Sequence, residues 1–173
     1  MDKNIMELVA GLMALSARTA PKAAGRDFLE IKVATGDQLE AMADACVAHS
    51  KERSNAHWER DGENIRKSDS VLLLALKEAK ASGLNCGACG FAKCSELPEL
   101  RRTADFEGPI CAWRLVDLGI ALGSAAKTAG ILNADNRIMY RAGVVAKQLK
   151  LIEGELVIGI PISATGKSIY FDR

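Results

Sequence analysis

Four of the five cysteines in this 173-residue chain lie close together in the sequence, as Cys86-x2-Cys89-x4-Cys94-x16-Cys111. An odd cysteine count does not suit a disulfide framework, and clustered thiols in a reducing compartment are more typical of metal or redox chemistry. Glycines follow the first two cysteines directly and allow the backbone to approach an inorganic group closely. We therefore expect the four thiols to serve metal or redox chemistry.

The fourth cysteine is predicted to open a helix. Cys111 follows Gly108-Pro109-Ile110 and precedes a long apolar stretch, and a proline at this position is a helix start signal. Free backbone N–H groups and the helix dipole stabilise a thiolate at a helix N-terminus. Cys46 stands apart on the apolar stripe of another predicted helix, so we expect it to be a small buried hydrophobe.

The spacing resembles that of small iron–sulfur domains in corrinoid iron–sulfur proteins and some membrane electron-transport subunits. Their pattern is C-x2-C-G-x3-C followed by x16-C, and Cys86, Cys89, Gly90, Cys94 and Cys111 match it. In that family the four cysteines hold one [4Fe-4S] cluster, so the resemblance implies the same ligand set here. Three alternatives remain open: a four-cysteine zinc site, a redox dithiol at the C-x2-C pair, and a set of inert thiols.

Composition bounds the class of protein. Lys+Arg 23 against Asp+Glu 22 gives a net charge of +1, whereas nucleic-acid binders usually carry a strong basic excess. A hydrophobic fraction of 49% with 26% charged residues is that of an ordinary globular domain. No apolar run approaches the roughly 18 residues of a membrane span. We expect a single cytoplasmic domain over 1–173, with 83–112 as its cysteine segment and no nucleic-acid or membrane partner.

Hydrophobic periodicity and capping residues predict alternating helices and strands, which is typical of an α/β or α+β fold. The helix that begins near residue 111 is apolar on nearly every side over 118–126, so we expect it to be central or at a subunit interface, as in a homodimer. Helices are expected over 4–18, 37–53, 111–130 and 135–149, a polar helix or loop over 61–67, and strands over 28–34, 70–76, 156–161 and 168–171.

Three segments extend the resemblance over most of the chain. Residues 83–90, 133–140 and 157–168 are similar to a prokaryotic family described as ferredoxin-domain-containing proteins. That resemblance implies an iron–sulfur site without fixing a reaction.

A further resemblance is to FMN-dependent nitroreductases, whose chains begin with a helix, an Arg-containing loop with a Pro turn, and a strand. The segment 18–28 is similar to that loop, although Arg18 alone stands for the paired arginines of that family. The resemblance implies a mixed sheet flanked by helices, into which the iron–sulfur segment is inserted, and a central helix at a dimer interface. It also implies FMN contacts from Arg18, Lys22, Gly25, Lys167 and Arg173.

The function expected from these features is electron transfer by a redox protein that binds one [4Fe-4S] cluster and serves an electron-transfer protein partner. With bound FMN it becomes a flavin-linked oxidoreductase. The alternative is a non-catalytic accessory protein that holds zinc or a structural cluster. One preparation made without oxygen distinguishes the two functions, because an iron–sulfur protein contains iron and sulfide whereas a zinc site contains no sulfide.

Overall fold

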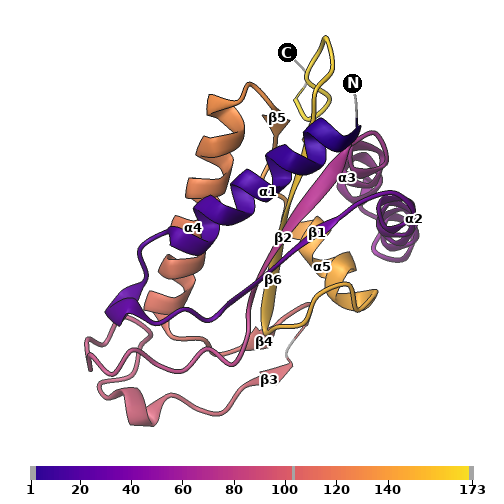
Figure 1. Ribbon diagram of the computed structural model, residues 1–173. Helices are drawn as coiled ribbons and strands as arrows, with labels where there is room; N and C mark the ends of the chain where they lie inside the picture. Colours follow the sequence, from indigo (N-terminus) through magenta and orange to yellow (C-terminus); the bar gives the residue numbers. More distant parts are fainter. Residues whose placement is uncertain (1–2, 103, 172–173) are drawn as a thin grey trace.

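The computed structural model describes residues 3–102 and 104–171, and these form an α+β domain (Figure 1). Most predicted elements are found close to their expected limits. The helices are α1 (Lys3–Thr19), α2 (Asp37–Glu52), α3 (Ala56–Arg66), α4 (Ala112–Ile131) and α5 (Tyr140–Gln148), with short 3-10 turns η1 (Ala23–Gly25) and η2 (Cys94–Glu96). The strands are β1 (Leu29–Ala34), β2 (Ser70–Leu76), β3 (Arg101–Arg102), β4 (Glu107–Gly108), β5 (Asp135–Asn136) and β6 (Leu156–Ser163).

A four-stranded sheet in the order β1-β2-β6-β5 forms the middle layer of the fold. The strand β2 is buried along its whole length, as expected for a continuous apolar run with a neighbour on either side. The resemblance implied a mixed sheet, but every pairing among the described strands is antiparallel. The α+β class expected from the sequence is thus confirmed, but its sheet is antiparallel rather than mixed.

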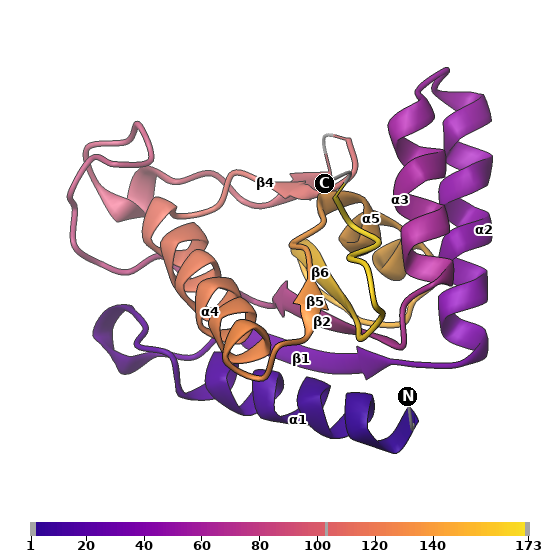
Figure 2. The same cartoon turned by 90° about the horizontal axis from the view of Figure 1, so that it is seen from above.

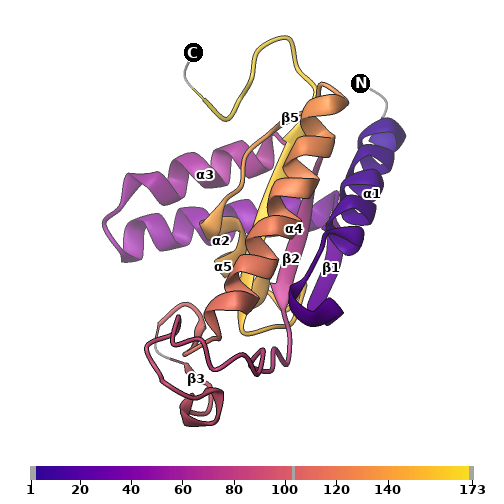
Figure 3. The same ribbon diagram turned by 90° about the vertical axis from the view of Figure 1, so that its left-hand side faces the viewer.

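Helices cover both faces of this sheet. Because side chains alternate along a strand, Leu72 and Leu74 of β2 pack with α1 and α4, while Val71 and Leu73 face α2, α3 and α5. Figures 2 and 3 show the two helical layers on opposite sides of the strands. The two cores contain few aromatic residues and are largely aliphatic, in keeping with the composition.

Three segments differ from the prediction. The helix expected over 135–149 begins only at Tyr140, because residues 135–136 pair with β6 as the strand β5. The helix α3 begins at Ala56 rather than near residue 61, because the Asn55 side chain accepts a hydrogen bond from the His57 amide and caps it. The strand predicted over 168–171 is wrong. That segment is instead held by side chains, since Tyr170 is buried and its hydroxyl lies 2.8 Å from the Ser68 hydroxyl.

The close packing of α5 on β6 gives the first prediction. A Cβ at Gly143 would collide with the Val157 carbonyl. We expect Gly143→Ala to lower the free energy of unfolding by about 2–3 kcal/mol, because the backbone must shift. Urea unfolding of the variant and the wild type measures this loss of stability. The matched control is Gly130→Ala, where no atom apart from the neighbouring backbone of α4 itself lies within 4 Å of the added methyl group. An equal effect of the two substitutions would show that this packing is unimportant.

Candidate functional site

The cysteine segment lies in the connection between β2 and α4, and with residues 77–82, which join it to β2, it is described below as one segment. Both of its ends are anchored. At the first end the Lys77 amide donates to the Phe28 carbonyl at 2.9 Å. At the far end Arg53 holds Asp105 through two hydrogen bonds of 2.6 and 3.1 Å, and this guanidinium lowers the pKa of the Asp105 carboxyl. Between these anchors most of residues 83–100 are exposed and only the short η2 is regular.

The structure places the four cysteines of the predicted ligand set on this segment and at its end. Cys86 is exposed, while Cys89 and Cys94 are partly buried. Cys111 is the N-cap residue of α4 and only 4% exposed. The prediction that Cys111 precedes a helix is therefore confirmed.

Hydrogen bonds reach two of the loop sulfurs. The indole Nε1 of Trp113 donates to Cys86 Sγ at 3.2 Å, which connects the exposed loop to the first turn of α4. The Asn85 amide donates to Cys94 Sγ at 3.4 Å, and the Cys94 amide donates back to the Asn85 side chain at 2.8 Å. Gly87 and Gly90 adopt positive φ values of 73° and 89°, the backbone freedom for which glycine was expected here.

The environment of Cys111 favours its thiolate. Burial opposes ionisation, but hydrogen bonds from Ser82 and from the amides of Trp113 and Arg114 outweigh burial, so the pKa of Cys111 lies below its ordinary value. By contrast, burial raises the pKa of Cys46 to about 12, and this thiol is fully enclosed in the core beside α3. Cys46 is thus the buried small hydrophobe that the sequence predicted.

The donor set fits an iron–sulfur cluster in chemical type. Such clusters are held by cysteine thiolates, and N–H groups directed at the sulfurs tune them. Among residues 3–102 and 104–171, however, no three His, Cys, Asp or Glu side chains are grouped so that they could hold a metal ion. The loop that carries three of the cysteines would therefore have to close onto the start of α4 before all four thiols shared one cluster.

A buried ion pair fixes the start of α4. Arg114 is fully buried, and its guanidinium lies 2.9 Å from the Asp117 carboxylate. It also donates to the carbonyls of Lys80 at 2.8 Å and Ala23 at 3.1 Å, and Asp117 accepts from the Ala23 amide at 2.7 Å. Sequence reasoning missed this pair. The available signal was an arginine and an aspartate three residues apart in an otherwise apolar helix.

The residues expected to contact FMN fall into two groups. Arg18, Lys22 and Gly25 lie together around η1, but two of them already have protein partners. Arg18 donates to Asp27 at 2.6 Å and to the Leu29 carbonyl at 2.8 Å. The Lys22 side chain is 5% exposed, and its ammonium donates to three carbonyls at the end of α1, those of Ala17, Arg18 and Ala20.

Lys167 does not join this group within one chain. Lys167 belongs to the segment after β6, and that segment leaves the sheet at the end opposite to the start of β1, as the strand register and Figure 1 show. Arg173 lies outside the described residues. Any FMN site built from all five residues therefore needs more than the arrangement seen in a single chain.

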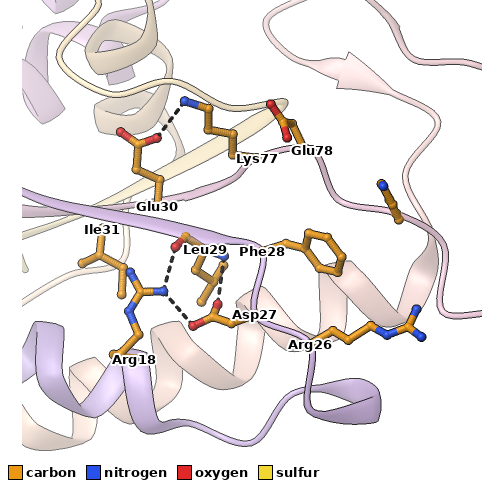
Figure 4. Close-up of a pocket in the computed structure, with 10 residues that line it drawn as sticks. Arg18, Arg26, Asp27, Phe28, Leu29, Glu30, Ile31, Lys77 and Glu78 are labelled. Carbon is orange, nitrogen blue, oxygen red and sulfur yellow. Dashed lines mark hydrogen bonds and ion pairs between the residues drawn. The ribbon is translucent and has the colours of Figure 1, made fainter.

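An open pocket of about 730 Å³ lies beside η1 and β1, next to the first residues of the cysteine segment (Figure 4). Its volume is within the range typical of small-molecule and cofactor sites. Phe28, Leu29 and Ile31 provide its apolar wall. The charged residues that line it are Arg18, Arg26, Asp27, Glu30, Lys77, Glu78 and Lys80.

Solved structures identify the fold. The chain is similar to the nitroreductase CinD from Lactococcus lactis in its complexes with 4-nitrophenol and with chloramphenicol, each with a TM-score of 0.62 and 15% identity over 96% of this chain and 84% of that one. The complex of the same enzyme with nicotinic acid gives a TM-score of 0.58 at 16% identity, over the same shares of both chains. The protein therefore has a nitroreductase-like fold.

The sequence comparisons identify the family. A protein of Archaeoglobus fulgidus, described as an uncharacterized protein, is 47% identical over 169 residues, which cover 97% of this chain and 91% of the relative. Residues 107–173 match the family described as "uncharacterized protein containing a ferredoxin domain (DUF2148)". The chain belongs to this family. The matched range includes Cys111 and begins after the other three cysteines of the segment.

One structural finding bears on the membrane prediction. Within the described parts of the chain, none of the helices combines the length and the apolar character needed to cross a bilayer.

The Arg114–Asp117 pair gives the second prediction. We expect Arg114→Met to lower the free energy of unfolding by about 3–5 kcal/mol, because it leaves the Asp117 carboxylate buried without its cation. The double variant Arg114→Met/Asp117→Asn keeps an acceptor for the Ala23 amide without a buried charge, so it should cost less than the single variant. Urea unfolding of both proteins measures this difference. A double variant less stable than Arg114→Met would contradict it.

Proposed function

We propose that this protein is an iron–sulfur redox protein in which Cys86, Cys89, Cys94 and Cys111 ligate one [4Fe-4S] cluster. The position of Cys111 carries the proposal: a thiol of lowered pKa caps a helix, and three further thiols lie on the loop that leads to it. Membership of a family described by its ferredoxin domain supports it. A cytoplasmic location belongs to the proposal, since free thiols persist in a reducing compartment.

When bound, a [4Fe-4S] cluster accepts and donates one electron at a time. The chain would contribute the ligands and the polar groups around them. The Cys111 thiolate, fixed at the N-terminus of α4, would provide the rigid ligand, and the Trp113 indole N–H would offer a hydrogen bond to the Cys86 sulfur. The exposed loop between the two anchors would close on binding, because metal binding and local ordering are coupled when a site is not preformed.

The nitroreductase-like fold supports the second part of the proposal, a flavin-linked oxidoreductase. We propose FMN as the flavin and the pocket beside β1 as its site, since this pocket is of suitable size and adjoins the cysteine segment. The chain would exchange electrons with a redox protein partner at the exposed cysteine loop, and flavin would pass them in pairs to a substrate. The related nitroreductase structures contain small aromatic molecules, which suggests an aromatic substrate.

A homodimer is also part of the proposal. The helices α1 and α4 cover the same face of the sheet and pack against each other, yet both keep large apolar side chains exposed on their outer sides. Exposed apolar patches of this kind mark interaction sites. The exposed residues are Ile5, Leu8, Leu12 and Leu15 of α1 and Trp113, Leu115, Val116 and Ile120 of α4.

The third prediction tests the cluster. Protein purified without oxygen should contain about four iron and four sulfide per chain, with a visible absorption that dithionite bleaches reversibly. Cys111→Ala should lose most of the iron and sulfide, because it removes the ligand fixed by α4. Cys46→Ala is the matched control and should keep its cluster, since Cys46 lies in the core beside α3.

Two outcomes of this experiment would overturn the cluster assignment. Equal cluster content in the two variants would show that Cys111 is not a ligand. Stoichiometric zinc without colour or sulfide would instead support the accessory metal-binding protein.

The fourth prediction tests the dimer. Light scattering during gel filtration should give the mass of two chains for the wild type and of one for Ile120→Asp, because a buried, unpaired carboxylate opposes association. The matched control is Ile138→Asp. Ile138 is comparably exposed at 45% but lies outside both helices, so this variant should remain dimeric. A monomeric wild type, or dissociation of both variants, would contradict the assigned surface.

A further inference from the structure

The cations near the predicted flavin loop differ in what they already bind. Lys22 is nearly buried and does not line the pocket, because its ammonium caps the carbonyls at the end of α1. Arg18 lines the pocket but is bonded to Asp27 and the Leu29 carbonyl. Lys77 is held by Glu30 at 3.3 Å and by Glu153 at 2.7 Å. These three side chains therefore have structural roles.

Two lining cations remain without such partners. Arg26 and Lys80 are both exposed, and within residues 3–102 and 104–171 neither side chain forms an ion pair or hydrogen bond. The backbone at both residues is nevertheless fixed. The Arg26 amide donates to the Ala23 carbonyl at 3.3 Å, and the Lys80 carbonyl accepts from the buried Arg114 at 2.8 Å. The two cations thus extend from anchored backbone around one pocket.

The apolar wall of the pocket suits a planar ligand. Three carboxylates also line the pocket: Asp27 and Glu30 are paired with Arg18 and Lys77, and Glu78 is the third. The Phe28 ring is held in place by the Arg114 guanidinium, whose carbon lies 4.7 Å from the ring centroid. An aromatic ring fixed in this way offers an apolar surface for a flat ligand. The site also adjoins the cysteines, since Ser82, two residues after Lys80, lies 3.7 Å from Cys111 Sγ.

We propose that Arg26 and Lys80 are the residues that hold the anionic group of a ligand in this pocket, and that this group is the phosphate of FMN. Phosphate is well suited to a guanidinium and an ammonium, because both donate charge-assisted hydrogen bonds. The inference rests on the flavin part of the proposed function. It assigns the phosphate contacts to Arg26 and Lys80, and it assigns Lys22, one of the expected FMN contacts, to the end of α1.

The test compares FMN with riboflavin, which lacks the phosphate. Each flavin is titrated into the cluster-loaded full chain, and binding is followed by quenching of flavin fluorescence. The wild type should bind FMN at least about tenfold more tightly than riboflavin. In Arg26→Gln/Lys80→Gln the affinity for FMN should fall to that for riboflavin, while riboflavin binding stays unchanged. Inorganic phosphate should compete with FMN in the wild type only.

Two control variants separate this role from a structural one. Lys51→Gln removes an exposed cation from α2, on the other face of the sheet, and should leave both affinities unchanged. Lys22→Met should lower the free energy of unfolding but keep the preference for FMN. An unchanged FMN preference in the double variant, or its loss in Lys22→Met, would overturn the assignment.

Iron and sulfide content, measured in the same samples, separates the two proposals. An intact cluster with no binding of either flavin to the wild type would overturn this inference and the flavin part of the proposed function, but not the cluster. Preferential binding of FMN to a protein without iron and sulfide would instead overturn the cluster and leave this inference standing.

Discussion

The buried guanidinium of Arg114 is the constraint on which the candidate site depends. Burying this charge is costly unless it is paired, and here the Asp117 carboxylate and two backbone carbonyls bind its Nε and Nη1 atoms, while its buried Nη2 has no partner among the described residues. The carbonyls belong to the loop after α1 and to the first part of the cysteine segment. The Arg114 side chain therefore fixes two segments relative to Cys111: the loop after α1, which the sequence associated with flavin, and the residues after β2, which lead to the other cysteines.

The cysteine segment combines a rigid end with an open middle. Cys111 belongs to a helix packed on the sheet, whereas Cys86, Cys89 and Cys94 lie on a stretch with little regular structure and mostly exposed side chains. Segments with few buried contacts open at low free-energy cost, so this part of the chain is the one that can rearrange around a ligand while the core stays intact. Such a division suits the proposed binding of a cluster after the core has folded.

Sequence patterns were sufficient where one local signal dominated. The continuous apolar run of β2, the proline before Cys111 and the apolar surroundings of Cys46 each led to the structure that is found. They were insufficient where distant partners decided the outcome. The conformation of 168–171 depends on the contact of Tyr170 with Ser68, and the position of Arg114 depends on the carbonyls of Ala23 and Lys80, all far away in the sequence. Lys22 is a different case, because the carbonyls that it binds lie only two to five residues before it. The grouping of the four thiols remains a prediction.

The sheet register explains why the loop after α1 and the cysteine segment meet. Leu29, the first residue of β1, pairs with Leu76, the last residue of β2, and the Lys77 amide extends this ladder by donating to the Phe28 carbonyl. The chain therefore enters β1 and leaves β2 at the same corner of the sheet. A shift of register would move the side chains of β1 relative to both helical layers, so the packing of the core also fixes this corner. A ligand held by the residues just before β1 must consequently lie beside the first residues after β2, which is the arrangement that the proposed electron exchange between a flavin and a cluster would require.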